Sequence, residues 1–254
     1  MTTNKKPTGK AIITGASSGI GKALAVEMAK KGYQLGLVAR RLDVLEQVKA
    51  EIIAQIPDAQ TVEVATLDVA QDETIYPVLE QLSNTLGGVD IIIANAGVTA
   101  INRTGTDNFA SDKHVIQVNL IGGMATVDAA AKIFRASGGG HIVGMSSVSA
   151  WTGIAGSSAY SSSKAGFSNY LKAVRAELSN KNIQVTTIHP GFINTDISTG
   201  MSKKPFVISA EKAAKEMLSA IQKKKDSVIV PSFPWSIITK IITVLPEKLV
   251  AKVQ

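Results

Sequence analysis

The sequence predicts an α/β fold in which one doubly wound parallel sheet of about seven strands has helices on both faces. Short apolar runs alternate with helix-period segments along most of the chain. The run "VDIIIANAG" is apolar through its centre, which is typical of a strand covered on both faces. No linker or repeat interrupts the pattern, so we expect one domain, 1–254, with a core at about 9–230 and a C-terminal helical extension at about 231–254.

The first half of the chain is expected to form four strands and the helices between them. The strands are short apolar runs, and the helices have apolar residues every three to four positions. Gly32 and Pro57 are expected to end the first two helices. The expected strands are 10–15, 33–40, 61–69 and 89–97, and the expected helices are 19–32, 42–56 and a stretch that reaches Leu86.

The second half continues the alternation with three more strands, at 138–147, 183–191 and 227–231. Long helical segments are expected at about 107–136 and 158–179. Ser209 is a typical N-cap residue and is expected to open the last helix of the core. In sheets of this kind ligands bind at the carboxyl ends of the strands, so the candidate site residues are sought there.

Composition excludes several classes of function. The chain has no cysteine, which excludes disulfides and cysteine-based metal sites, and its three histidines are scattered, so no metal is expected. The formal charge is +7, but the lysines are dispersed and the aromatic residues are not interleaved with them. We therefore expect a surface that favours small anionic ligands and no nucleic-acid partner. The start of the chain has no long apolar run, so a cytoplasmic location is expected.

The turn after the first expected strand reads "TGASSGIG" and resembles a pyrophosphate-binding loop. Gly15 allows a tight turn, and Gly19 and Gly21 allow the backbone to approach a pyrophosphate. The helix that follows offers N–H groups and the positive end of its dipole. Taken alone, these glycines could simply mark a tight turn without a ligand. Because they lie between a strand and a helix, they indicate dinucleotide binding. The expected contacts are Gly15, Ser17, Ser18, Gly19, Ile20 and Gly21.

The end of the second expected strand, "VARR", indicates which dinucleotide binds. An acidic residue in place of Ala39 would bond the ribose hydroxyls of NAD. Arg40 and Arg41 instead suit the 2′-phosphate of NADP(H), because a guanidinium pairs well with phosphate. The alternative is that both are surface arginines at the start of a helix. The next two strand ends are expected to contact the adenine and the cofactor ribose through Asp68, Val69, Asn95, Ala96 and Gly97.

As a set, these motifs resemble the short-chain dehydrogenase/reductase family. "TGASSGIG", "NAG", Asn119, a Ser–Tyr–Lys set and "PGFINT" occur in the family's order and spacing. The resemblance implies a Rossmann-type fold and an NADP(H)-dependent oxidoreductase that acts on a carbonyl or a secondary alcohol. It implies that the catalytic residues are Ser147, Tyr160, Lys164 and Asn119, and that the nicotinamide end is held by Tyr160, Lys164, Pro190, Gly191, Ile193 and Thr195.

The implied residue types suit reduction of a carbonyl by hydride. Tyr160 would exchange a proton with the substrate oxygen, and Ser147 would donate a hydrogen bond to it. A free tyrosine has a pKa of about 10, which the charges of Lys164 and the oxidised nicotinamide are expected to lower. Asn119 would anchor a water. Taken alone, a tyrosine and a lysine four residues apart could simply lie on one exposed face of a helix. The other motifs favour a catalytic role for the pair.

Two alternative functions stay open. One is a catalytically idle NADP-binding sensor or scaffold, and the other is an epimerase or enoyl reductase of the same family. An intact Ser–Tyr–Lys set argues against the sensor. The substrate is expected to be a small molecule that is uncharged or partly apolar, because the segments 148–158 and 196–206 are mostly small or apolar. The expected walls of its pocket are Trp151, Ile154, Phe192 and Met201.

The tail beyond Phe233 is expected to form an amphipathic helix that is too short and too interrupted to span a membrane. Three roles stay open: a lid or subunit contact, an anchor on a membrane surface through Lys240 and Lys248, or core packing. The family resemblance and the small residues near Asn119 and Tyr160 imply a homodimer or homotetramer. The residues expected on one face of the tail helix are Trp235, Ile238, Ile242, Leu245 and Leu249.

Overall fold

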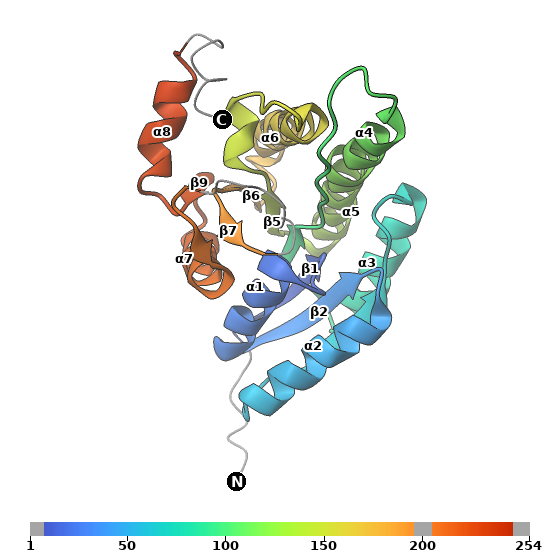
Figure 1. Ribbon diagram of the computed structural model, residues 1–254. Coiled ribbons are helices and arrows are strands. Elements are labelled where there is room, and N and C mark those ends of the chain that lie inside the picture. The colour runs from blue at the N-terminus through green and yellow to red at the C-terminus, as the bar shows by residue number, and fades with distance from the viewer. Residues whose placement is uncertain (1–7, 196–204, 246–254) are drawn as a thin grey trace.

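Seven parallel strands form the central sheet, as the sequence predicts, with helices on both of its faces (Figure 1). The computed structural model describes residues 8–195 and 205–245. Every neighbouring pair of strands in the sheet is parallel. In spatial order the strands are β3 (Val62–Thr66), β2 (Tyr33–Ala39), β1 (Gly9–Thr14), β4 (Ile91–Ala94), β5 (Gly140–Met145), β6 (Ile183–Pro190) and β9 (Ser227–Val230).

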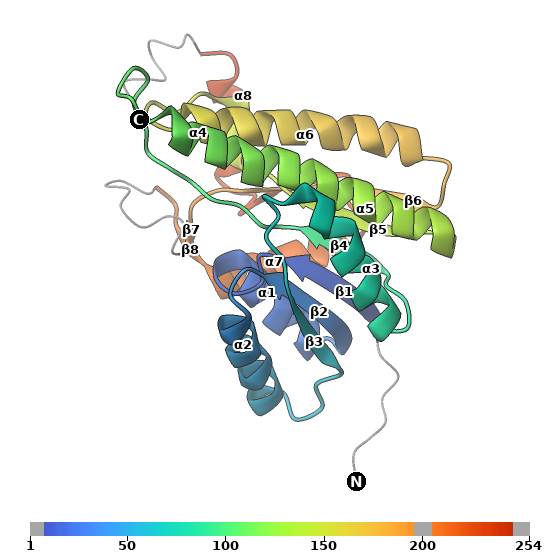
Figure 2. The same cartoon turned by 90° about the vertical axis from the view of Figure 1, so that its right-hand side faces the viewer.

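The helices form two layers, which the turned view in Figure 2 also shows. One face of the sheet is covered by α1 (Gly19–Lys30), α2 (Leu42–Gln55) and α7 (Ala210–Gln222). The other face is covered by α3 (Ile75–Thr85), α5 (Gly122–Ser137) and α6 (Ser158–Leu178), and α4 (Phe109–Ile116) packs against α6.

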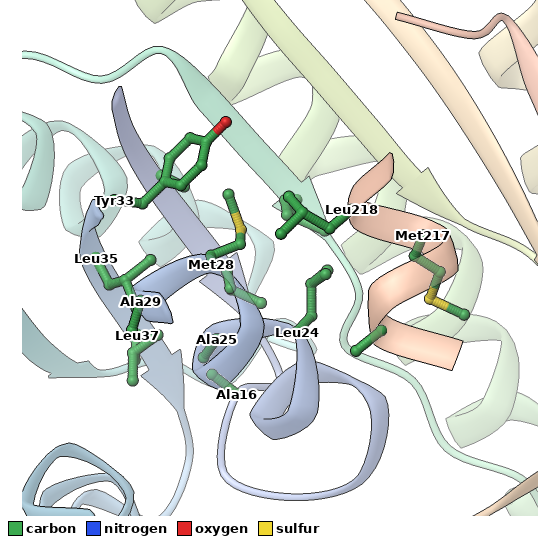
Figure 3. Close-up of a cluster of buried hydrophobic side chains, with 14 of the residues drawn as sticks. Ala16, Leu24, Ala25, Met28, Ala29, Tyr33, Leu35, Leu37, Met217 and Leu218 are labelled. Carbon is green, nitrogen blue, oxygen red and sulfur yellow. The ribbon is translucent and has the colours of Figure 1, made fainter. Parts of the chain in front are cut away.

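Two hydrophobic clusters, one on each face, hold these layers together. Successive strand residues point to opposite faces, so Ile12 joins one cluster while Ile13 joins the other. Figure 3 shows the cluster on the α1 face, where side chains from α1, α7 and β2 gather. Leu24 and Met28 there are fully buried, and burial of each such side chain contributes roughly 1.5–3 kcal/mol. This double-sided burial explains why the strand sequences are almost continuously apolar.

All seven expected strands and the expected core helices are present, with ends shifted by a few residues. Ser209 caps α7, since its hydroxyl accepts a hydrogen bond from the Lys212 amide at 3.2 Å. The expected helix at about 107–136 consists of α4 and α5 joined by a π-helical turn, Gln117–Ile121. Elements that the sequence pattern did not predict are the short strands β7 (Ile193–Asn194) and β8 (Ile208–Ser209), and the 3₁₀ turns η1 (Asp72–Thr74) and η3 (Val148–Trp151).

The tail forms α8 (Trp235–Ile242), which packs against η3 and β9. On its inner side Trp235 and Thr239 are buried and Ile238 and Ile242 are half-buried. Core packing therefore accounts for one face of the helix. Ile237 and Ile241 on its outer side are exposed, as are Phe233 and Val244 just beyond its two ends.

The predicted apolar face of the tail is only partly buried, because Leu245 is exposed. Leu249, the last residue of that face, and Lys248, named for the membrane anchor, lie outside the described residues. Within residues 8–195 and 205–245, no helix combines the length and apolar composition that crossing a bilayer requires.

Candidate active site

A cavity of about 540 Å³ lies at the carboxyl ends of the strands. It opens beside the ends of β1 and β4, where the strand order reverses, and such a crevice is the usual ligand site of a doubly wound sheet. Every residue predicted to contact the cofactor lines this cavity, from Gly15 to Thr195. The fold therefore brings the separate motifs together at one place.

The glycine loop between β1 and α1 needs glycine for two different reasons. Gly15 and Gly19 have φ angles of +67° and +56°, a backbone region that other residues rarely adopt. A Cβ on Gly21 would lie 2.4 Å from the Gly15 carbonyl oxygen, so any side chain there would displace the loop. With this packing the first residues of α1 line the cavity, and their N–H groups can receive a phosphate.

Both arginines after β2 line the same cavity, beyond the glycine loop. Arg41 Nη2 donates a hydrogen bond to the Ser17 hydroxyl at 3.4 Å, which directs this guanidinium toward the loop. Arg40 is exposed at the rim. Ala39, at the end of β2, also lines the cavity and offers no carboxylate.

The end of β4 is tied to the end of β1 by polar contacts. The Thr14 hydroxyl accepts hydrogen bonds from the Asn95 and Ala96 amides at 3.0 and 3.1 Å. Asn95 Nδ2 donates to the Thr14 carbonyl at 2.9 Å. Thr14 was not predicted, although its position at the last residue of the first strand was a usable signal. Asp68 also lines the cavity, and its Oδ1 accepts the Ala70 amide at 3.0 Å.

Three of the four candidate catalytic residues lie just after β5 or on α6. Ser147 follows β5 and accepts a hydrogen bond from the Ser149 amide at 3.1 Å, which fixes the serine at the start of η3. Tyr160 lies in the first turn of α6 and forms a hydrogen bond with Ser147. Lys164 lies one helical turn later, and its Nζ donates to the Met145 carbonyl at 3.0 Å. The serine, the phenol and the amine therefore face one end of the cavity.

Burial controls the protonation of this group. Burial raises the pKa of the Tyr160 phenol, and its hydrogen bond with Ser147 acts in the opposite direction. Burial also lowers the pKa of Lys164 to about 8. With the protein's own groups alone, the pKa of Tyr160 is therefore raised, whereas Lys164 and the oxidised nicotinamide together were expected to lower it. Burial of the phenol is the largest cause of this rise, and the Lys164 amine lies 5.8 Å from the centre of the phenol ring.

Asn119 lies in the π-helical turn and does not line the cavity. Its Oδ1 accepts the Val98 amide and its Nδ2 donates to the Val98 carbonyl, both at 2.8 Å. Nδ2 also lies 3.2 Å from the Ser163 hydroxyl, on α6. The side chain thus joins the segment after β4 to the helix that carries Tyr160. Single π-helical turns frequently occur at functional sites.

The expected substrate walls are only partly in place. Ile154 and Phe192 line the cavity, whereas Met201 lies outside the described residues. Trp151 does not line the cavity; its ring packs against His189, with centroids 4.3 Å apart and planes tilted by 39°. Ile101 was not predicted, but it lines the cavity and is 67% exposed, so it adds an apolar residue at the mouth.

His189 is a further neighbour of the catalytic serine that the sequence pattern did not identify. Its Nδ1 lies 3.4 Å from the Ser147 carbonyl oxygen, and the residue is almost fully buried. Burial lowers the pKa of His189 to about 4, so the ring is neutral at physiological pH. Through this contact with the carbonyl oxygen, the ring helps to hold the backbone of Ser147 in place. The only signal in the sequence was its position directly before the "PG" pair.

Comparisons with known proteins agree with this geometry. The family model described as short chain dehydrogenase matches residues 9–205. An uncharacterized oxidoreductase of Mycobacterium tuberculosis is 34% identical over 241 residues, which cover 94% of this chain and 95% of that protein.

Solved structures show the same similarity. A short-chain type dehydrogenase/reductase from Mycobacterium marinum matches with a TM-score of 0.80 and 26% identity, covering 88% of this chain and 94% of that one. An alcohol dehydrogenase from the archaeon Thermococcus sibiricus, complexed with 5-hydroxy-NADP, matches with a TM-score of 0.77 and 26% identity, covering 87% and 95%. The chain belongs to the short-chain dehydrogenase/reductase family and is an oxidoreductase.

Proposed function

We propose that the protein is an NADP(H)-dependent oxidoreductase that transfers a hydride between nicotinamide and a carbonyl or secondary alcohol substrate. The observation that carries this proposal is the hydrogen-bonded pair of Ser147 and Tyr160, with Lys164 beside it, at one end of a cavity. The other end of the same cavity holds the glycine loop and two arginines. A proton donor and a dinucleotide cradle in one cavity are what hydride transfer requires.

The residues present suit a dinucleotide with an additional phosphate. The start of α1 provides N–H groups for the pyrophosphate, and no acidic side chain lies in its first turn. Arg40 and Arg41 provide a positive rim where a 2′-phosphate would be held, and Ala39 provides no partner for a bare ribose. The similar alcohol dehydrogenase whose structure contains 5-hydroxy-NADP supports the same choice. When bound, the cofactor supplies or accepts the hydride.

The chain's own residues manage the proton and the oxygen. Burial keeps the Tyr160 phenol protonated at neutral pH, which suits a group that must donate a proton to the oxygen of a reduced carbonyl. Ser147 orients that phenol and is placed to donate a hydrogen bond to the same oxygen. Lys164 would hold the nicotinamide ribose. Asn119 would hold two parts of the site in their relative positions, the segment that follows β4 and the helix α6.

The test is turnover by the variant Tyr160→Phe with NADPH and a panel of aldehydes and ketones. This variant keeps the ring but removes the proton donor, so turnover is expected to fall by at least about 100-fold, the scale of general acid catalysis. The dissociation constant for NADPH, measured by titration, is expected to stay within about threefold of wild type, because the glycine loop and arginines are unchanged.

The matched control is Tyr170→Phe, which removes a hydroxyl from the same helix but outside the cavity. It is expected to retain full turnover. Activity of Tyr160→Phe near the wild-type level would remove Tyr160 from the mechanism. Wild-type protein that binds NADPH but reduces no carbonyl would instead favour the idle NADP-binding sensor.

A further inference from the structure

Trp235, at the start of α8, packs against Gly191 and Phe192, two residues that line the cavity. Its side chain is buried, although the residue lies in the tail of the chain and outside the segment that the family model matches. The indole meets Phe192 edge-on, with ring centroids 5.6 Å apart and planes at 67°. It meets Phe206 in the same way, at 6.3 Å and 89°. The tail thus reaches the segment that follows β6.

The indole also packs against Gly191. A Cβ on Gly191 would lie 2.4 Å from Trp235 Nε1 and 2.6 Å from Cδ1, closer than real Cβ atoms approach other atoms. The φ angle of Gly191 lies outside the left-handed region, so the backbone conformation itself does not require glycine. The indole is therefore what excludes a side chain at this position.

Gly191 and Phe192 line the cavity, whereas Trp235 does not. The Gly191 amide donates to the Val230 carbonyl at 2.8 Å, so this segment is held by β9 on one side and by the indole on another. The helix that carries Trp235 also packs against η3, which begins directly after Ser147. One side chain of the tail therefore supports the Phe192 wall, and its helix contacts the segment after the catalytic serine.

Stability alone does not explain a tryptophan here. The indole N–H is buried and has no hydrogen-bond partner among the described residues. A buried donor without a partner destabilises a fold, and a phenylalanine would fill much of the same space without that cost. Because the indole fits directly against Gly191, its shape points to a role in positioning that segment rather than in stabilising the fold.

We propose that Trp235 is a positioning residue that holds Gly191 and Phe192 in place, and that the α8 tail thereby sets the shape of the apolar wall beside the nicotinamide. This proposal rests on the proposed function for its substrate. It assigns to the tail a part in how a carbonyl substrate is oriented for hydride transfer. The chemical class it selects is a carbonyl compound with an apolar group that packs on Phe192.

The first experiment compares Trp235→Ala, Trp235→Phe and the control Ile237→Ala, which truncates an exposed residue of the same helix. For Trp235→Ala, the KM for the best carbonyl substrate is expected to rise by at least about tenfold, because Phe192 loses its support. The dissociation constant for NADPH is expected to change by less than about threefold, because the phosphate contacts proposed for the glycine loop and the two arginines do not involve Gly191. Trp235→Phe is expected to recover only part of the loss, because the smaller ring fills less of the space against Gly191, and Ile237→Ala is expected to match wild type.

The second experiment is a double-mutant cycle that needs no substrate. Gly191→Ala is expected to lower the melting temperature by roughly 5 °C in the wild-type background, because its Cβ meets the indole. In the Trp235→Ala background the same change is expected to cost less than about a third as much.

The outcomes separate the two proposals. A lower melting temperature for Trp235→Ala with an unchanged KM would mean a structural role only and would overturn the positioning proposal. An effect of Gly191→Ala that is equal in both backgrounds would also overturn it. If wild type reduces no carbonyl at all, the proposed function and the role of the tail in substrate orientation both fail, while the cycle still supports or refutes the contact between Trp235 and Gly191.

Discussion

Replacement of Lys164 by methionine tests how much the buried charge of this lysine lowers the stability of the fold. Lys164 is 4% exposed, and burial lowers its pKa from 10.5 to about 8. With 10.5 as the value in the unfolded chain, placing the ammonium in the fold costs about 3 kcal/mol at pH 7. Methionine has a similar shape and no charge, so the variant Lys164→Met does not have this cost.

The dependence on pH has a definite sign. The pKa of Lys164 is lower in the fold than in the unfolded chain, so between pH 8 and 10.5 the unfolded chain binds more protons. Wild-type stability therefore gains from this residue as pH rises through that window. Below pH 8 the full cost applies. The advantage of Lys164→Met over wild type is expected to shrink by about 2 kcal/mol between pH 7 and pH 9.5.

This difference separates the charge from other effects of the substitution. Loss of the 3.0 Å hydrogen bond to the Met145 carbonyl affects the variant at both pH values, so it cancels in the comparison. The assay is urea unfolding without cofactor, followed by tryptophan fluorescence at equal protein concentrations. The control is Lys113→Met, which changes an exposed lysine on α4.

A stability difference between Lys164→Met and wild type that is constant from pH 7 to pH 9.5 would refute the argument, as would one that grows. The same variant is expected to lose turnover, because the amine that would hold the nicotinamide ribose is gone. Gain of stability with loss of activity is the usual relation at a functional site.

Three other outcomes are expected. Wild type should bind NADPH at least about tenfold more tightly than NADH at low salt, since a charge-assisted bond contributes about 1.5–3 kcal/mol and these exposed groups are screened. Titration should show this preference falling in Arg40→Ala and Arg41→Ala, and equal affinities in wild type would contradict it. Gly21→Ala should abolish cofactor binding and lower the melting temperature, because its Cβ would lie 2.4 Å from the Gly15 oxygen. Light scattering should give the mass of a homodimer or homotetramer, and a monomer mass at micromolar concentration would exclude both.

The sequence by itself determined the order of strands and helices, and it identified most of the residues that line the cavity. Both depend on local rules. Apolar periodicity depends on which neighbours a residue has along the chain, and parallel strands bring their carboxyl ends to one edge whatever their exact lengths. Gly15, Arg41 and Tyr160 could therefore be placed at one site before any contact was known.

Only the tertiary structure decided how side chains at that edge face one another. Trp151 was expected to line the cavity, but its ring packs against His189, so the contact joins η3 to β6 instead. The direction of the Tyr160 pKa depends on desolvation, which is a property of everything packed around the ring and leaves no mark in a motif. Trp235 reaches Gly191 across 44 positions of the sequence. Contacts between segments so far apart depend on the path of the whole chain, and no local pattern of residues records them.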